Sequence, residues 1–183
     1  MASTYSSALN LELQATGENS GTWGTIINNN LQKLESATKG YVSVAIASTS
    51  DSLTATDGST TDEQSNAIIK LTGTLTGNTT MQCEAVESWY IVDNATTMGT
   101  YTLGFKPAGG TATNLVASSK HLLYSDGSTM FDVLEDAGNI KANGTLTVSG
   151  NTSLNGGTFI FNEDSADVDF RIEGNGDANL FFT

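Results

Sequence analysis

The sequence has very few of the residues that usually build catalytic or metal sites. Cys83 is the only cysteine and His121 the only histidine among 183 residues. A single cysteine excludes an internal disulfide and a zinc site built from several cysteines. His121 stands at the start of an apolar strand-like run, where we expect a structural role rather than a place in a catalytic triad. We therefore expect neither an enzyme nor a protein that holds a metal or a cofactor.

Basic residues are scarce as well. Seven lysines and arginines stand against 20 acidic residues, which gives a net charge of −13. Nucleic-acid binding needs clustered positive charge, so we expect no nucleic-acid partner and no anionic membrane surface. No run approaches the roughly 18 apolar residues of a membrane span. The N-terminal run also lacks the basic and apolar segments of a secretory signal.

Small polar residues and glycine dominate instead. Only 38% of the residues are hydrophobic and 15% are charged, and the chain has a single proline. This composition favours short, polar-faced strands joined by many turns over a helical bundle or a disordered chain. We expect a mainly β protein in three parts, which are an N-terminal arm with a helix (1–40), a β-domain (41–136) and the start of a shaft (137–183).

The arm carries three leucines at every second position. Leu9, Leu11 and Leu13 alternate with polar residues, which is the period of a half-buried strand. No neighbouring segment offers an immediate pairing partner. We therefore expect the arm to pair with an edge on its own domain or on another protein, and we name these leucines as candidate partner-binding residues.

The period then changes to that of one amphipathic helix of about four turns. Ser20 or Thr22 is placed to cap its start, and Gly40 suits a left-handed residue after its end. Three asparagines in its middle are weak helix formers, tolerated only if packing or hydrogen bonds offset their propensity. The helix either packs on its own domain or also contacts a partner. Its apolar stripe completes the partner-binding candidates: Trp23, Ile27, Leu31 and Leu34.

Residues 41–136 show strand signals at short spacing. Five to eight short strands predict a small antiparallel β-sandwich or barrel. Asp126-Gly127 tolerates positive φ angles and predicts a hairpin between the flanking apolar runs. The expected core draws on nine residues: Trp89, Ile91, Tyr101, Leu103, Leu115, Leu122, Tyr124, Phe131 and Val133.

Residues 137–183 have very short strand signals separated by glycine-containing turns. Their apolar residues are too sparse for one chain to close a core, and no disulfide can staple it. We therefore predict a homotrimer whose strands wind around a shared axis. The trimer core would consist of Leu146, Val148, Phe159, Phe161, Val168, Phe170, Ile172, Leu180 and Phe182.

Four acidic residues in this last part require a separate interpretation. A calcium loop of the EF-hand type starting at Asp167 would need glycine and glutamate where Ile172 and Ala178 stand. Paired carboxylates could instead hydrolyse a polysaccharide. Strand alternation favours a third reading, in which Asp167, Asp169 and Glu173 form the solvent-facing side of a hairpin. The four acidic candidates for polysaccharide hydrolysis are Asp164, Asp167, Asp169 and Glu173.

Several stretches resemble proteins of tailed bacteriophages. The run STYSSALNLELQATGENSGTWGTIINNNLQKLESATKGYVSV, within roughly residues 3–46, resembles the start of fibre-like virion proteins, especially those of phages of marine bacteria. The resemblance centres on Thr16-Gly17-Glu18 and Gly21-Thr22-Trp23-Gly24. WYIVDNAT and LLYSDGSTMFDVL resemble the β-domain that usually follows. GNIKANGTLTVSGNTSLNG and FNEDSADVDFRIEGNGDANLFF are similar to shaft repeats of trimeric phage fibres.

The resemblance implies a structural tail fibre, made in the host cytoplasm and located in the virion. Its N-terminal part would attach to a tail adaptor or tail tube protein, and a distal part would bind a receptor on the host surface. No distal tip follows Thr183, so we expect a truncated fibre. The alternatives are a capsid decoration fibre, a surface adhesin and a polysaccharide-degrading tailspike enzyme.

Overall fold

The structure, a computed structural model, describes residues 3–134. These residues belong to the first of the two compact units into which the chain divides, Met1–Ile140. The predicted shaft, its nine core residues and the four acidic candidates lie outside the described residues.

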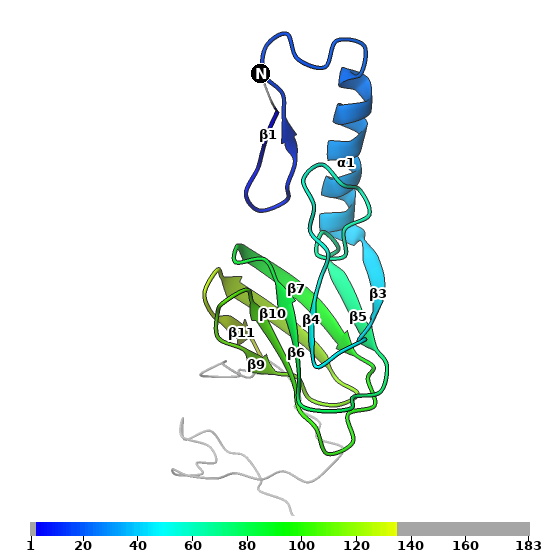
Figure 1. The fold of residues 1–183 in the computed structure, drawn as a ribbon, viewed down its shortest axis with the longest axis vertical. Coiled ribbons are helices and arrows are strands. Elements are labelled where there is room, and N and C mark those ends of the chain that lie inside the picture. The colour runs from blue at the N-terminus through cyan, green and yellow to red at the C-terminus, as the bar shows by residue number, and fades with distance from the viewer. Residues whose placement is uncertain (1–2, 135–183) are drawn as a thin grey trace, which may run out of the picture. The chain divides into compact units, whose positions relative to one another are not determined.

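The arm is a small hairpin rather than one strand. β1 (Thr4–Tyr5) pairs antiparallel with β2 (Glu12–Leu13), as Figure 1 shows. The strand predicted over the three leucines is wrong, because a turn includes Leu9 and Asn10 takes a positive φ of 51°. The arm thus pairs with itself after all, and only Leu13 of the three leucines lies in a strand.

The predicted helix is confirmed as α1 (Trp23–Lys39), but both of its expected ends differ. Thr22 occupies the N-cap position, yet its hydroxyl donates to the Asn19 carbonyl and caps no helical N–H. Gly40 has φ −65° and ψ 146°, which is extended rather than left-handed. Glycine is needed there for space, since an added Cβ would overlap the backbone of Ser36 and the side chain of Asn66.

The β-domain consists of two sheets. The first has five strands in the order β11-β10-β7-β5-β3 and the second has four in the order β4-β6-β8-β9. The first sheet comprises β3 (Tyr41–Ala45), β5 (Ile68–Thr72), β7 (Glu87–Asn94), β10 (Lys120–Asp126) and β11 (Met130–Asp132). The second comprises β4 (Ser50–Ser52), β6 (Thr79–Cys83), β8 (Leu103–Pro107) and β9 (Thr113–Asn114).

From β3 to β8 the chain alternates between the two sheets. As a result β3, β5 and β7 run parallel in one sheet, and β4, β6 and β8 run parallel in the other. Each strand of one sheet serves as the long return connection that parallel neighbours in the other require. The predicted mainly β fold with one helix is confirmed. The predicted antiparallel arrangement of the β-domain is found only in the pairs that β10, β11 and β9 form. The sheets do not close into a barrel.

The core lies between the two sheets. Ile69, Leu71 and Val92 from the first sheet are fully buried, as are Met81, Leu103 and Phe105 from the second. The rings of Tyr90 and Phe105 lie 5.7 Å apart at a tilted angle, which joins β7 to β8 across the core.

Most of the predicted core residues lie on the wrong side of their strands. Leu103 and Leu115 are buried, and Ile91 is half-buried. Strands β7 and β10 instead bury Tyr90, Val92 and Leu123. A strand with apolar residues on both faces does not indicate which face turns inward, because alternation is then lost. Six predicted core residues are exposed: Trp89, Tyr101, Leu122, Tyr124, Phe131 and Val133.

The predicted hairpin at Asp126-Gly127 is confirmed by the antiparallel pairing of β10 and β11. Gly127 has a φ of +88°, a conformation that favours glycine. The Asp126 carboxylate accepts hydrogen bonds from the Ser128 and Thr129 N–H groups, at 2.8 and 2.6 Å. These hydrogen bonds favour the charged carboxylate, so they lower the pKa of Asp126.

Candidate interaction surface

His121 is engaged in structural hydrogen bonds. Its Nδ1 lies 2.5 Å from Asp132 Oδ2, and its Nε2 accepts a hydrogen bond from the Val116 N–H at 3.1 Å. Both ring nitrogens are thus occupied, which agrees with the structural role expected from the sequence. Within residues 3–134, no cluster of three or more histidine, cysteine, aspartate or glutamate residues has the arrangement of a metal site. No helix in this range is long and apolar enough to cross a membrane.

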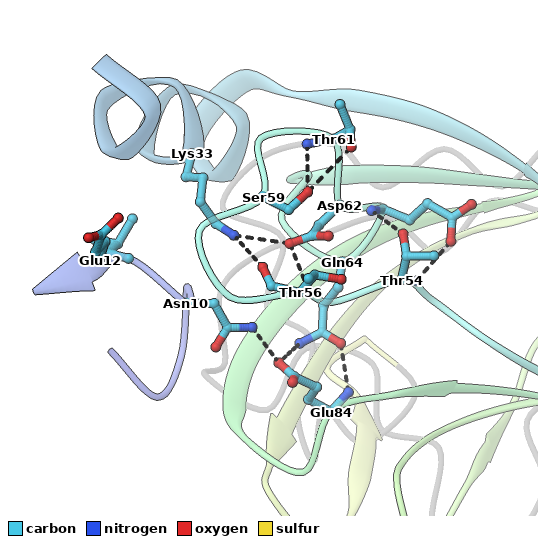
Figure 2. Close-up of polar contacts among 12 residues, drawn as sticks. Asn10, Glu12, Lys33, Thr54, Thr56, Ser59, Thr61, Asp62, Gln64 and Glu84 are labelled. Carbon is cyan, nitrogen blue, oxygen red and sulfur yellow. Dashed lines mark hydrogen bonds and ion pairs between the residues drawn. The ribbon is translucent and has the colours of Figure 1, made fainter. Parts of the chain in front are cut away.

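A buried ion pair orients α1. Lys33 is 1% exposed, and its Nζ lies 3.0 Å from Asp62 Oδ2 and donates to the Thr56 carbonyl at 3.3 Å. Thr56 completes the group by donating its N–H to the same Asp62 oxygen at 3.0 Å (Figure 2). A lysine that buries its charged end must stay paired, since an unpaired buried charge is very costly. The lysine face of α1 is therefore held against the β4–β5 connection.

Asparagine side chains attach the arm on two sides. Asn30 donates its amide N–H to the Glu12 carbonyl at 2.9 Å, while its Oδ1 accepts from the Glu12 N–H at 3.0 Å. Asn10 donates to Glu84 at 3.2 Å, and Gln64 donates to the same carboxylate oxygen (Figure 2). These bonds offset the weak helix propensity of Asn30, as the sequence required. They also hold β2 beside the helix.

The apolar stripe of α1 is left facing solvent. Among the predicted partner-binding residues, Trp23 is 64% exposed and Leu31 is 57% exposed. Ile27 and Leu34 are exposed as well. This is the reverse of a helix that packs by its apolar side, because here the polar side is turned to the domain. The structure thus presents the predicted stripe as an uncovered surface.

The three arm leucines are not equivalent. Leu13 is 52% exposed, whereas Leu9 and Leu11 are half-buried. Leu9 lines a groove of about 360 Å³ together with Leu34 of α1 and Trp89 of β7. The groove therefore joins the arm, the helix stripe and the first sheet.

The outward face of the first sheet continues this surface. Two rows of paired residues cross it, and in one of them the Tyr124 and Phe131 rings stack at 6.2 Å. Sequence reasoning placed most of these side chains in the core. The signal that could have identified them is the apolar character of both faces of β7 and β10. The first row consists of Tyr41, Ile68, Ile91 and Leu122. The second row consists of Trp89, Tyr124 and Phe131.

Comparisons with known proteins do not assign the chain to a family. No family model, no curated protein and no solved structure matches it. The resemblance to phage fibre proteins therefore stays a prediction, and functional inference depends on the surface described above.

Proposed function

We propose that the chain is the virion-proximal part of a structural, homotrimeric tail fibre of a tailed bacteriophage. One observation carries the proposal, which is that polar contacts hold the arm and α1 in place while their apolar residues stay exposed. Such rigid apolar surfaces are typical of proteins that bind other proteins. The resemblance of residues 3–46 to the start of phage fibre proteins supports the same function.

The arm is the part that would attach to the virion. Among the described residues its sheet consists of β1 and β2, and Asn30 occupies the outer backbone groups of Glu12 in β2, so the edge without a partner belongs to β1. A tail adaptor or tail tube protein can add a strand to such an edge, with the exposed Leu13 filling a pocket of the partner. The distal part of the fibre would bind a host-surface receptor, and assembly into virions would follow synthesis in the host cytoplasm.

A charge on the arm tests this attachment. Leu13→Asp places a carboxylate where the partner would need an apolar side chain, and because Leu13 is exposed the fold is retained. We expect purified virions carrying this variant to contain little or no fibre in an immunoblot. Ser7→Asp is the matched control, since Ser7 is an exposed residue in the turn of the same arm. Normal incorporation of Leu13→Asp would refute attachment through the arm.

The position of the protein in the virion separates the alternatives. Immunogold labelling of native virions should mark the tail. Labelling of the capsid would indicate a decoration fibre, and labelling of a cell surface without virions would indicate an adhesin. Release of sugars from host polysaccharide by the purified chain would contradict a purely structural role.

A further inference from the structure

The exposed residues of α1 follow the spacing of a coiled-coil seam. Along one side of the helix the spacing is three, four, three and four residues, from Gly24 through Ile27, Leu31 and Leu34 to Thr38. Tyr41, in β3, follows three residues later. Ile27, Leu31 and Leu34 occupy heptad positions a and d, with Trp23 at a flanking g position, and such a narrow stripe is characteristic of a seam between helices. Within α1 the a positions are Gly24, Leu31 and Thr38, and the d positions are Ile27 and Leu34.

The seam connects directly to the aromatic face of the first sheet. Tyr41 begins the outward row that crosses β5, β7 and β10. Leu34 and Trp89 line the same groove, so the helix stripe and the second row meet there. Buried centres of protein interfaces are enriched in tyrosine, tryptophan and phenylalanine, as this face is.

We propose that this surface, formed by the α1 seam and the outward face of the first sheet, is where parallel copies of the same chain associate. Contacts between copies then involve Trp23, Ile27, Leu31 and Leu34, and the arm remains available for the virion partner. Such parallel association through α1 would serve any oligomer, whether or not the chain is a tail fibre.

Charge favours a second copy as the occupant. Copies with a net charge of −13 repel each other unless they meet at a surface with few acidic residues. No charged residue occupies an a or d position of α1, and Glu35 is the single one at its e and g positions. In parallel helices an e residue faces a g residue of the neighbour, and the g residue opposite Glu35 is Asn30, which is uncharged and has its amide bonded to the Glu12 backbone. On the outward face of the sheet, Lys70 and Lys120 offset two of the three acidic residues Glu87, Asp93 and Asp126, and Asp93 is paired with Lys120 at 3.7 Å.

The central seam residues favour more than two copies. Leucine at a combined with isoleucine at d favours three or four strands over two, and Leu31 and Ile27 provide this combination, whereas Leu34 occupies the second d position of α1. A trimer is the smallest assembly that satisfies it.

Cysteine pairing tests the parallel arrangement directly. Leu31→Cys puts a thiol at the seam, where identical residues of parallel copies lie within disulfide reach. We expect mild oxidation of the whole chain to cross-link Leu31→Cys at least about tenfold faster than the neighbouring control Gln32→Cys, which points away from the seam. The native Cys83 is buried and does not interfere. Equal or absent cross-linking of the two variants would overturn the proposal.

Tryptophan fluorescence tests whether copies cover the surface. The chain has two tryptophans, Trp23 and Trp89, and both lie on the proposed interface with at least half of their surface exposed in one chain. Rising protein concentration should shift their emission to the blue and protect them from acrylamide. Leu31→Glu should remove both effects at equal concentration.

The remaining outcomes identify other occupants. Tryptophans protected in a chain whose molar mass by light scattering is monomeric would show that the chain covers itself. Tryptophans accessible in an oligomer would show assembly through other residues. Either result would contradict the proposed association through the seam. Neither would contradict virion attachment through the arm, because Leu13→Asp tests that function separately.

Discussion

Lys33 shows how one residue can set which side of a helix faces the domain. Its apolar neighbours on α1 would ordinarily pack inward, but its ion pair with Asp62 turns the opposite side toward the domain. The orientation of α1 follows from the energetic cost of each arrangement. Burying Lys33 without Asp62 would be very costly, whereas leucines can remain exposed on a protein surface at little cost.

The ion pair can be tested by a mutant cycle. Lys33→Met leaves Asp62 buried without its cation and should lower the free energy of unfolding by about 3–5 kcal/mol. Adding Asp62→Asn should recover much of this loss, because an amide oxygen can still accept the Thr56 N–H. Urea unfolding followed by circular dichroism measures both. A loss below about 1 kcal/mol for Lys33→Met would show that the pair does not hold the helix.

Cys83 should react only slowly with thiol reagents in the folded chain. Burial raises the pKa of its thiol from 9.0 to about 11, so very little reactive thiolate exists at pH 8. We expect a thiol reagent to label Cys83 slowly in buffer and at once in urea. Because the folded pKa exceeds the unfolded value, this group should also cost stability as the pH rises from about 9 to 11. Rapid labelling of the folded chain would contradict the burial.

At the scale of elements, the sequence predicted those helices and turns that are determined by residues close together in the chain. The helix and the Asp126-Gly127 hairpin were predictable because a period of 3.6 and a turn pair act within a few residues. The arm was not, since the positive φ of Asn10 breaks the alternation of its leucines. Gly40 was predicted as a helix end for the wrong reason, because the structure requires its small size and not its free φ.

Two glycines of the helix region separate these reasons. Gly40→Ala should destabilise the chain by about 1–3 kcal/mol, since the new methyl group meets the Ser36 backbone. Gly24→Ala is the control, because nothing lies within 4 Å of its added Cβ. It should stabilise α1 by about 1 kcal/mol through helix propensity. Thermal unfolding of both variants measures the difference, and equal effects would contradict the close approach at Gly40.

At the scale of the whole molecule, the two faces of the first sheet have different roles. Its inner face packs on the second sheet, whereas its outer face carries aromatic residues that one chain leaves exposed. Stability and association should therefore respond to different substitutions, even though the residues alternate along the same strands.

A pair of substitutions tests this division. Phe105→Ala, in the core, should lower the free energy of unfolding by about 3–5 kcal/mol. Trp89→Ser, on the outer face, should lower it by only about 1 kcal/mol, the size of a lost cross-strand pair with Tyr124, at concentrations where the chain is monomeric. Trp89→Ser should instead weaken association measured by sedimentation. A large loss of monomer stability for Trp89→Ser would place that side chain in the core after all.

The amino-acid sequence by itself determined the mainly β class, the helix, the Asp126-Gly127 turn and the apolar residues of the stripe. These follow from periods and turn chemistry, which act over a few neighbouring residues. The tertiary structure decided the parallel direction of the strands, the face of β7 and β10 that turns inward, and the exposure of the stripe. Each of these depends on contacts between distant residues, such as Lys33 with Asp62 and Tyr90 with Phe105, which no local pattern encodes.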